Sequence, residues 1–261
     1  MSLGERTAYY SFGEDGKAFT GGYKEVTEGE KTDYYYYLPN GQAYTSGYKT
    51  VKIDGVTYYY FFEQDGKAFT GGEKEIAFGS LSFLYCFGEN GQALAGQFAE
   101  KNGETVYYAA NGRKVADDFA TVDDSIYFFD ENGAMQKATW FVYEDGCYYA
   151  QENGQLLTDA VKEGYRLDET GKCSLKYRVL EHISEYTEET MTREEKIRAL
   201  FDSVLLNDWP YIGSYEHVLN DWTWEEGWTD DFATDLLDRC GGNCFRYAAF
   251  FGFLVKESTG L

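Results

Sequence analysis

The sequence is short of basic residues: 23 lysines and arginines stand against 45 aspartates and glutamates, for a formal net charge of −22. Because binding to nucleic acids or anionic membranes needs clustered Lys and Arg, we expect neither as a partner. The simplest consequence of such a charge is solubility. Long apolar runs are lacking too, so we expect no membrane span.

Histidine and cysteine are also scarce. The two histidines are His182 and His217, and the five cysteines show no paired Cys-x-x-Cys spacing that would indicate a zinc site or a disulfide framework. We therefore predict no metal and no cofactor, and we expect the cysteines to be mostly small buried residues. The opening residues MSLGERT lack the layout of a signal peptide, which suggests that native N-terminal sequence, with any secretion signal, has been removed.

Aromatic residues are abundant, at 19% of the chain with 25 tyrosines. They recur in copies of one pattern, an aromatic run followed in most copies by Asp-Gly or Asn-Gly and then by a second short run. The copies align on their turn glycines, which are Gly16, Gly41, Gly66, Gly91, Gly112, Gly133, Gly154 and Gly171. Successive spacings are 25, 25, 25, 21, 21, 21 and 17 residues, a regularity that is typical of solenoids.

Each copy is predicted to form a β-hairpin, because Asp-Gly supplies the positive φ angles of a two-residue turn and Tyr and Phe suit strands. A tyrosine lies six residues before most turn glycines, as at Tyr10 and Tyr35. A lone hairpin cannot bury such rings, whereas stacked hairpins bury them against one another. We therefore predict a mainly β fold: an elongated solenoid of stacked β-hairpin repeats over residues 1–176, followed by a small α-helical segment over residues 177–261.

The pattern of aromatic-Tyr-Tyr, Asp/Asn-Gly, a small residue and Gly-aromatic resembles the cell-wall-binding repeats of Gram-positive surface proteins, which include choline-binding and glucan-binding repeats. The resemblance covers roughly residues 8–175. It implies an extracellular, cell-wall-associated protein whose partner is a cell-wall or surface glycan, such as a choline-bearing polymer. In the choline-binding members it implies a cage of rings, chiefly tryptophans, that holds a quaternary ammonium by cation–π attraction.

The sequence departs from that pattern where the family favours tryptophan, seven residues after and seven residues before the turn glycine. The candidate ligand-binding residues at these positions are Tyr9, Tyr23, Tyr34, Tyr48, Tyr59, Phe98, Phe119 and Trp140. Complete cages are expected only near the first three copies. Because ring faces serve ammonium binding, sugar stacking and plain packing equally well, choline, another glycan and a pure spacer role all stay open.

Past Lys176 the aromatic period stops and helical signals begin. The segment from Thr192 to Glu195 has the form of a capping box before an apolar stripe, which predicts an amphipathic helix. A second helix is predicted after Thr229, where two aspartates suit a first turn, and it should end at Gly241.

Asn243 can cap a third helix, which its many apolar residues predict to be central and buried. This places Cys244 in the first turn, where the helix dipole stabilises a thiolate. The alternative is that Cys244 is a small buried residue, and we expect Cys240 to be a packing residue.

The segment WTDDFATDLLDRCGGNCFRYAAFFGFL, together with the preceding REEKIRALFDSVL, resembles the transglutaminase-like superfamily over about residues 190–261. The resemblance implies a papain-like α+β domain in which Cys244 is the nucleophile, a protein glutamine or peptide is the acyl donor, and a downstream His and Asp complete the site. These partners are absent from the sequence. We therefore expect an incomplete, catalytically silent domain in which Phe250, Phe251 and Phe253 are partly exposed or covered by another chain.

Three functions follow from these two resemblances. The first is a wall-binding protein that carries an incomplete acyl-transfer domain, and the second is a purely structural or adhesive surface protein with a non-catalytic cysteine domain. The third is a cysteine peptidase, in which water rather than an amine resolves the thioester. Both His182 and His217 precede Cys244, against the order of the superfamily, so we expect them to have surface or helix-flanking roles.

Overall fold

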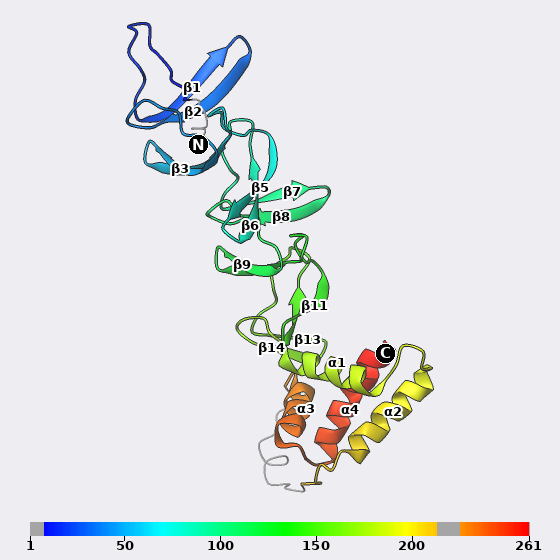
Figure 1. Ribbon diagram of the computed structural model, residues 1–261. Coiled ribbons are helices and arrows are strands. Elements are labelled where there is room, and N and C mark those ends of the chain that lie inside the picture. Colours follow the sequence, from blue (N-terminus) through cyan, green and yellow to red (C-terminus); the bar gives the residue numbers. More distant parts are fainter. Residues whose placement is uncertain (1–7, 213–224, 261) are drawn as a thin grey trace. The chain divides into compact units, whose positions relative to one another are not determined.

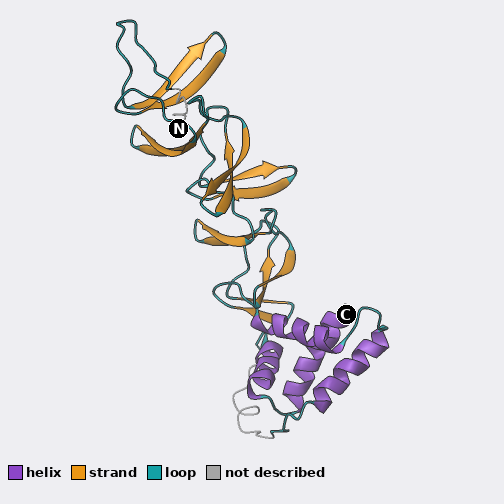
Figure 2. Ribbon diagram, in the orientation of Figure 1, coloured by secondary structure: helices purple, strands orange, loops and turns teal. Residues whose placement is uncertain are grey.

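The computed structural model describes residues 8–212 and 225–260. Within these ranges it contains fourteen strands, which pair as seven antiparallel two-stranded hairpins, and four helices (Figures 1 and 2). By its contacts the chain falls into two compact units, Met1–Ala120 with Phe129–Met135, and Thr121–Phe128 with Gln136–Leu261. The mainly β character and the hairpin repeats are confirmed, and the elongated solenoid stays a prediction.

The hairpins become shorter along the chain in regular steps. Three have seven-residue strands: β1 (Gly22–Glu28) with β2 (Lys31–Tyr37), β3 (Gly47–Ile53) with β4 (Val56–Phe62), and β5 (Gly72–Phe78) with β6 (Leu81–Phe87). Three have five-residue strands: β7 (Gln97–Lys101) with β8 (Glu104–Tyr108), β9 (Asp118–Val122) with β10 (Ser125–Phe129), and β11 (Thr139–Tyr143) with β12 (Gly146–Ala150). The last has three-residue strands, β13 (Ala160–Lys162) with β14 (Tyr165–Leu167).

Each hairpin fills the interval between two turn glycines, so a copy that is four residues shorter has lost two residues from each strand. Side chains alternate between the two faces of a strand with a period of two. Removing two residues from a strand therefore leaves all the remaining side chains on their original faces. The repeat therefore shortens without exchanging its inner and outer faces.

The turn glycines lie in three-residue loops, which corrects the predicted two-residue turn. In the second copy, Gly41 N donates to Leu38 O at 2.9 Å, Leu38 N donates to Gln42 O at 2.8 Å, and only the glycine of this loop has a positive φ. This is a type I turn followed by a left-handed residue. Two-residue turns lie instead at the tips of the strand pairs; at Asp54 and Gly55 both residues have a positive φ, whereas at the first tip only Gly29 does.

Neighbouring copies are joined by a backbone hydrogen bond at a constant repeat position. The amide two residues after a turn glycine donates to the carbonyl seven residues before the preceding turn glycine. The donor–acceptor pairs are Ala43–Tyr9 (2.9 Å), Ala68–Tyr34, Ala93–Tyr59, Lys114–Leu84, Met135–Thr105 and Leu156–Ile126 (all 2.8 Å), and Cys173–Cys147 (2.7 Å). Each copy thus satisfies a backbone amide of the next, as in repeat proteins whose units contact only their neighbours.

The recurring tyrosine six residues before the turn glycine is buried beneath the next copy. Tyr60 is 0% exposed, and a Cβ added to Gly91 would lie 3.5 Å from its ring and 3.0 Å from Ala68 Cβ. Gln92, directly after that glycine, donates from Nε2 to the Tyr60 hydroxyl at 3.2 Å. Glycine at the turn therefore lets the following copy approach the ring, and glutamine satisfies the hydroxyl that this approach buries.

Four helices follow the last repeat: α1 (Ser174–Tyr186), α2 (Arg193–Leu206), α3 (Trp228–Arg239) and α4 (Cys244–Thr259). The capping box is confirmed, because Thr192 and Glu195 bond each other's backbone amides at the start of α2. The second helix is confirmed as α3, although it ends at Arg239 rather than at Gly241. None of the described helices is long and apolar enough to span a membrane.

Helix α4 packs against the other three helices (Figure 1), as its apolar sequence predicts. Phe250 is 0% and Phe253 is 5% exposed, so the expectation that they are partly exposed is wrong, and only Phe251 is half-buried. His182 of α1 packs on Phe250 and Tyr165 of β14 packs on Phe253, and α1 is a helix that the sequence reasoning did not predict. Its signal was an apolar stripe with a spacing of four residues, at Leu175, Val179 and Ile183.

One hydrophobic core joins the last hairpins to the helices within the C-terminal unit. Its members include Cys147, Tyr165, Leu167, Cys173, Leu175, Val179, Leu200, Leu236, Phe250 and Leu254. These residues lie on both sides of residue 176, where the sequence analysis placed a domain boundary. That boundary stays a prediction.

Candidate functional site

At four repeat positions, the aromatic residue seven positions after a turn glycine contacts two further aromatic rings. We name each group after this residue: the Tyr23 set (Tyr23, Tyr34, Tyr60), the Tyr48 set (Tyr48, Tyr59, Tyr85), the Phe98 set (Phe98, Tyr107, Phe129) and the Trp140 set (Trp140, Tyr149, Tyr165). The structure thus pairs four predicted residues, Tyr23 with Tyr34 and Tyr48 with Tyr59. The third ring of each set, from the following copy, was not predicted.

The Tyr48 set has the most regular geometry. Tyr48 and Tyr59 are half-buried and nearly parallel, with ring centroids 5.8 Å apart and an angle of 8° between the planes. Tyr85 closes the group at 4.8 Å from Tyr48. The Tyr48 hydroxyl donates to Asn111 O at 2.8 Å, and burial raises the pKa of Tyr48. The set therefore presents neutral ring surface, which suits a cation or the apolar face of a sugar.

The Tyr23 set adds a carboxylate to similar rings. Tyr23 lies 6.2 Å from Tyr34 and 5.3 Å from Tyr60, measured between ring centroids. Its hydroxyl donates to Glu25 Oε1 at 3.4 Å, and burial raises the pKa of Tyr23. A negative charge beside neutral rings favours a cationic group in a ligand.

The other candidates are arranged differently. Tyr9 is 38% exposed, and its carbonyl takes part in the bonding between copies. Phe119 lies half-buried on β9. The third copy carries Glu73 where the sets have a ring, and this carboxylate accepts from the Tyr108 hydroxyl at 3.0 Å. Three-ring sets therefore form at the first and second copies but not at the third, and the Phe98 and Trp140 sets lie beyond the copies where cages were expected. That any of these sets is a ligand cage stays a prediction.

Other aromatic pairs of the array lie beneath the chain's own lysines. Lys49 Nζ lies 4.4 Å from the Tyr36 centroid and 4.8 Å from that of Tyr44. The next copy repeats this arrangement, with Lys74 Nζ 4.6 Å from two phenylalanine rings. Sequence reasoning missed these contacts, although the signal was present: Lys24, Lys49 and Lys74 all lie eight residues after a turn glycine. Because these rings already hold a cation, they are poor sites for an external one.

Cys244 is exposed at the first residue of α4. Asn243 caps the helix as predicted, with its side-chain oxygen accepting from Arg246 N at 3.3 Å, and it is 1% exposed. The preceding turn is held by Gly242, whose N donates to Pro210 O at 3.2 Å. The alternative that Cys244 is buried is therefore wrong, as is the packing role for Cys240, which is also exposed.

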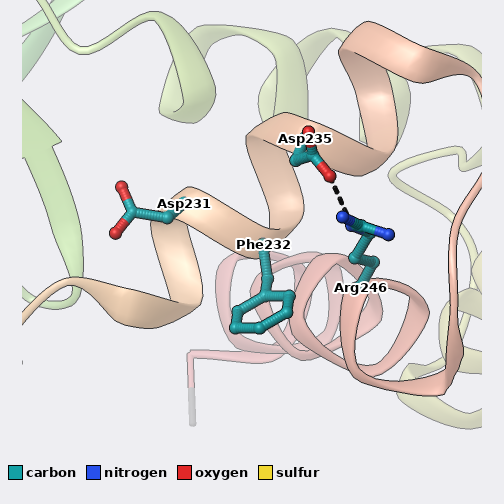
Figure 3. Close-up of a pocket in the computed structure, with 4 residues that line it drawn as sticks. All are labelled: Asp231, Phe232, Asp235 and Arg246. Atoms are coloured by element: carbon teal, nitrogen blue, oxygen red, sulfur yellow. Dashed lines mark ion pairs between the residues drawn. The ribbon is translucent and has the colours of Figure 1, made fainter. Parts of the chain in front are cut away.

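A shallow pocket between α3 and α4 lies near this helix start (Figure 3). It is lined by Asp231, Phe232, Asp235 and Arg246, and Arg246 forms an ion pair with Asp235. Arg239 Nε also bonds Asp235, at 2.5 Å. Arg239 and Arg246 are therefore both paired with Asp235. The pocket provides ionic contacts, and none of its lining residues is a histidine that would serve as a general base.

Only one histidine lies in the described part of the chain. His182 Nε2 is 2.8 Å from Ser203 Oγ, and its ring packs against Tyr186 at 4.6 Å and Phe250 at 5.2 Å. Burial lowers the pKa of His182, which favours the neutral ring. The side chain is half-buried on α1 and also lines a surface pocket with Arg178 and Glu181, so the expected surface or flanking role stays a prediction. His217 lies outside the described residues.

The comparisons with known proteins concern the repeats. Residues 98–140 match the sequence family described as a choline-binding repeat. This segment contains three of the predicted candidate residues, Phe98, Phe119 and Trp140. No curated protein matches the chain.

Solved structures similar to this chain come from Streptococcus pneumoniae. CbpJ is 20% identical over 60% of this chain and 49% of its own, with a TM-score of 0.42. Choline binding protein F, solved in the presence of a peptidoglycan analogue, is 21% identical over 66% of this chain and 56% of its own, with a TM-score of 0.45. The choline-binding domain of CbpL is 18% identical over 66% of this chain and 84% of its own, with a TM-score of 0.41. The chain thus spans about half the length of the first two of these proteins.

Proposed function

We propose that the chain is a cell-wall-associated, extracellular binding protein whose aromatic repeats hold a choline-bearing polymer or another wall glycan. The observation that carries the proposal is the Tyr48 set, in which two nearly parallel, half-buried rings and a third ring form a neutral aromatic group at a recurring repeat position. The match of residues 98–140 to choline-binding repeats supports the same class of ligand.

Charge favours some of the possible wall polymers over others. With a formal net charge of −22, the chain repels polymers that carry only phosphate or carboxylate groups. An ammonium-bearing polymer avoids this repulsion, and the ring faces together with Glu25 attract its cation. Choline is therefore favoured over an anionic ligand, while a neutral glycan that stacks on the rings is the alternative.

Sedimentation of the full chain with purified cell walls tests this proposal. We expect saturable binding to walls that carry choline, competition by free choline, and weaker binding after Tyr59→Ala or Tyr34→Ala. Phe201→Ala removes an aromatic ring that is 47% exposed on α2, outside the repeats, and is the matched control that leaves binding unchanged. Binding that survives excess choline would indicate the glycan, and no binding to any wall would leave only the spacer or adhesive role.

We further propose that Cys244 is the nucleophile of an acyl-transfer site whose base is not His182. The exposed thiol at the start of α4 supports this role, because a nucleophile must be accessible to its acyl donor. A glutamine-bearing protein or a peptide would be the acyl donor, and the thiolate would displace the amide nitrogen to form a thioester. Because His182 bonds Ser203 in the core, we expect this chain alone to be inactive.

Incorporation of a labelled amine into a glutamine-bearing protein tests the second proposal. The expected result for the 261-residue chain is no turnover. Turnover that is lost in Cys244→Ser but kept in His182→Gln would mean that another group supplies the base. Hydrolysis without amine transfer would indicate the peptidase rather than the transglutaminase reaction.

A further inference from the structure

In the C-terminal unit, the Trp140 set already holds a cation. The ammonium of Lys176, in the first turn of α1, lies 4.7 Å from the Trp140 centroid and 4.7 Å from the Tyr165 centroid. The Lys176 side chain is only 6% exposed, so water is nearly excluded from these contacts. Cation–π attraction is strongest when the cation is desolvated in this way.

A carboxylate from another helix completes this ammonium site. Glu257 of α4 accepts from Lys176 Nζ at 2.6 Å through Oε2, and from the Tyr165 hydroxyl at 3.1 Å through Oε1. The buried positive charge is thus balanced by one carboxylate and two ring faces. Such a charge is tolerated in a protein interior only while its partner is present.

The rings of this site are the repeat equivalents of rings in the other sets. Trp140 lies seven residues after Gly133, as Tyr48 lies seven residues after Gly41. In the Tyr48 set all the rings come from hairpins, and the Trp140 set is built in the same way. The difference is that α1 and α4 supply an ammonium and a carboxylate to the Trp140 set.

We propose that the Trp140 set is an ammonium-binding site whose occupant is the chain's own Lys176. In this role it fastens α1 and α4 to the last repeats instead of taking an external ligand. A free alkylammonium enters only when the Lys176 ammonium is removed. This inference does not depend on wall binding, since it concerns an internal contact that is measurable in the purified chain.

Two further lysines make the site unfavourable for a second cation. Lys162 Nζ lies 4.5 Å from the Tyr149 centroid, and Lys256 Nζ lies 5.5 Å from that of Tyr165 while it donates to Glu163 O at 2.6 Å. Like charges at this range repel an added cation. The external ammonium that the repeats are proposed to bind therefore belongs in the Tyr23 and Tyr48 sets.

Chemical rescue tests the proposal. Lys176→Ala deletes the atoms that propylammonium contains, and it leaves Glu257 without its partner, so we expect a large fall in the melting temperature of the full chain. Propylammonium should raise that temperature saturably in Lys176→Ala, and it should raise it more than sodium chloride does. Lys172→Ala is the matched control, because Lys172 bonds Asp145 at 2.7 Å at the surface, and it should show no such rescue.

Two outcomes of the rescue experiment would overturn the proposal. One is a response to propylammonium that is no greater in Lys176→Ala than in the wild-type chain or in Lys172→Ala. The other is equal rescue by propan-1-ol, which fills the same space without a charge and would indicate simple cavity filling.

A spectroscopic measurement on the unmodified chain keeps the proposal falsifiable if Lys176→Ala does not fold. In a chain labelled at its lysines, ring currents from Trp140 and Tyr165 should shift the Lys176 ε-methylene resonance upfield of other lysines. Lys176→Arg assigns the signal. Adding choline should leave it in place. The absence of an upfield-shifted lysine signal, or its loss on adding choline, would contradict self-occupancy.

Discussion

Cys147 and Cys173 lie opposite each other across an antiparallel bridge, where Cys173 N donates to Cys147 O at 2.7 Å. Both thiols are buried, and burial raises the pKa of Cys147 to about 11 and that of Cys173 to about 12. Because the thiolate is the reactive form, both should resist alkylation at neutral pH. Cys240 and Cys244 are exposed, so iodoacetamide at limiting concentration should label them first.

Mass-spectrometric mapping of the labelled peptides checks this order. Labelling in urea is the control, since unfolding should make the reactivities of the five cysteines similar. If Cys147 reacted as fast as Cys244 in the folded chain, the core that contains it would have to open readily.

Asp230→Asn should stabilise the chain at neutral pH. Asp230 is 6% exposed, and burial raises the pKa of its carboxyl to about 6 although Arg166 N donates to it at 3.0 Å. A raised carboxyl pKa contributes stability that is present below the unfolded-state value and is lost as the pH rises through the folded-state value. The gain from Asp230→Asn should therefore be on the order of 3 kcal/mol at about pH 7 and become small near pH 4.

Urea unfolding of both chains at several pH values measures this difference. Asp145→Asn is the control, and it should destabilise the chain at neutral pH rather than stabilise it. The reason is that the hydrogen bond from Lys172 lowers the pKa of Asp145 and so favours its charged form. A gain for Asp230→Asn that did not change with pH would contradict the titration of this carboxyl.

A pair of glycine substitutions separates backbone strain from contact between copies. Gly55 and Gly66 have φ angles of +82° and +83°, but an added Cβ meets nothing within 4 Å at Gly55, whereas at Gly66 it lies 3.0 Å from Ala43 Cβ. Gly55→Ala should cost about 1–2 kcal/mol for the left-handed backbone alone. Gly66→Ala should cost a further ~1–3 kcal/mol because it overpacks the interface between copies. If urea unfolding gave equal losses of unfolding free energy for the two variants, the interface between copies would accommodate the added methyl group without cost.

The hydrogen bond between Gln92 and the Tyr60 hydroxyl should contribute measurably to the stacking of copies. A double-mutant cycle with Gln92→Ala and Tyr60→Phe is expected to give a coupling of about 0.5–1.5 kcal/mol. The equivalent pair in the first copy, Gln42 and Tyr10, is the matched control. Because Tyr10 is 45% exposed, its coupling should be smaller. Equal couplings would mean that burial does not strengthen this bond.

Much of the repeat was predictable because its signals are local. The turn glycines gave the number and the length of the copies, and Thr192 and Asn243 gave two helix starts. The two-residue turn was misplaced because Asp-Gly also suits a type I turn followed by a left-handed glycine. Telling these turns apart needs the φ angle of the residue before the glycine, which the sequence does not contain.

The parts of the candidate site that were missed depend on contacts between distant segments. Trp140 was predicted from its repeat position, but Lys176 and Glu257 reach it from two helices. Their separation in the sequence hides this contact. The exposure of Cys244 was left open for the same reason, because a helix start indicates a capped first turn but does not reveal which neighbours cover it.

The shortening of the hairpins by two residues in each strand also defines which insertions and deletions the gene can tolerate. The bonds between copies start from residues beside the turn glycines, so the far tip of each hairpin can be trimmed without touching them. A deletion of four residues across a tip, two from each strand, leaves the tip turn connecting the same kind of residue pair, whereas a deletion of one residue per strand moves the turn to the alternate kind of pair, for which a two-residue turn is less suited. Hairpin length is thus an adjustable dimension, and such arrays can change their width in evolution or by engineering while the junctions between copies stay the same.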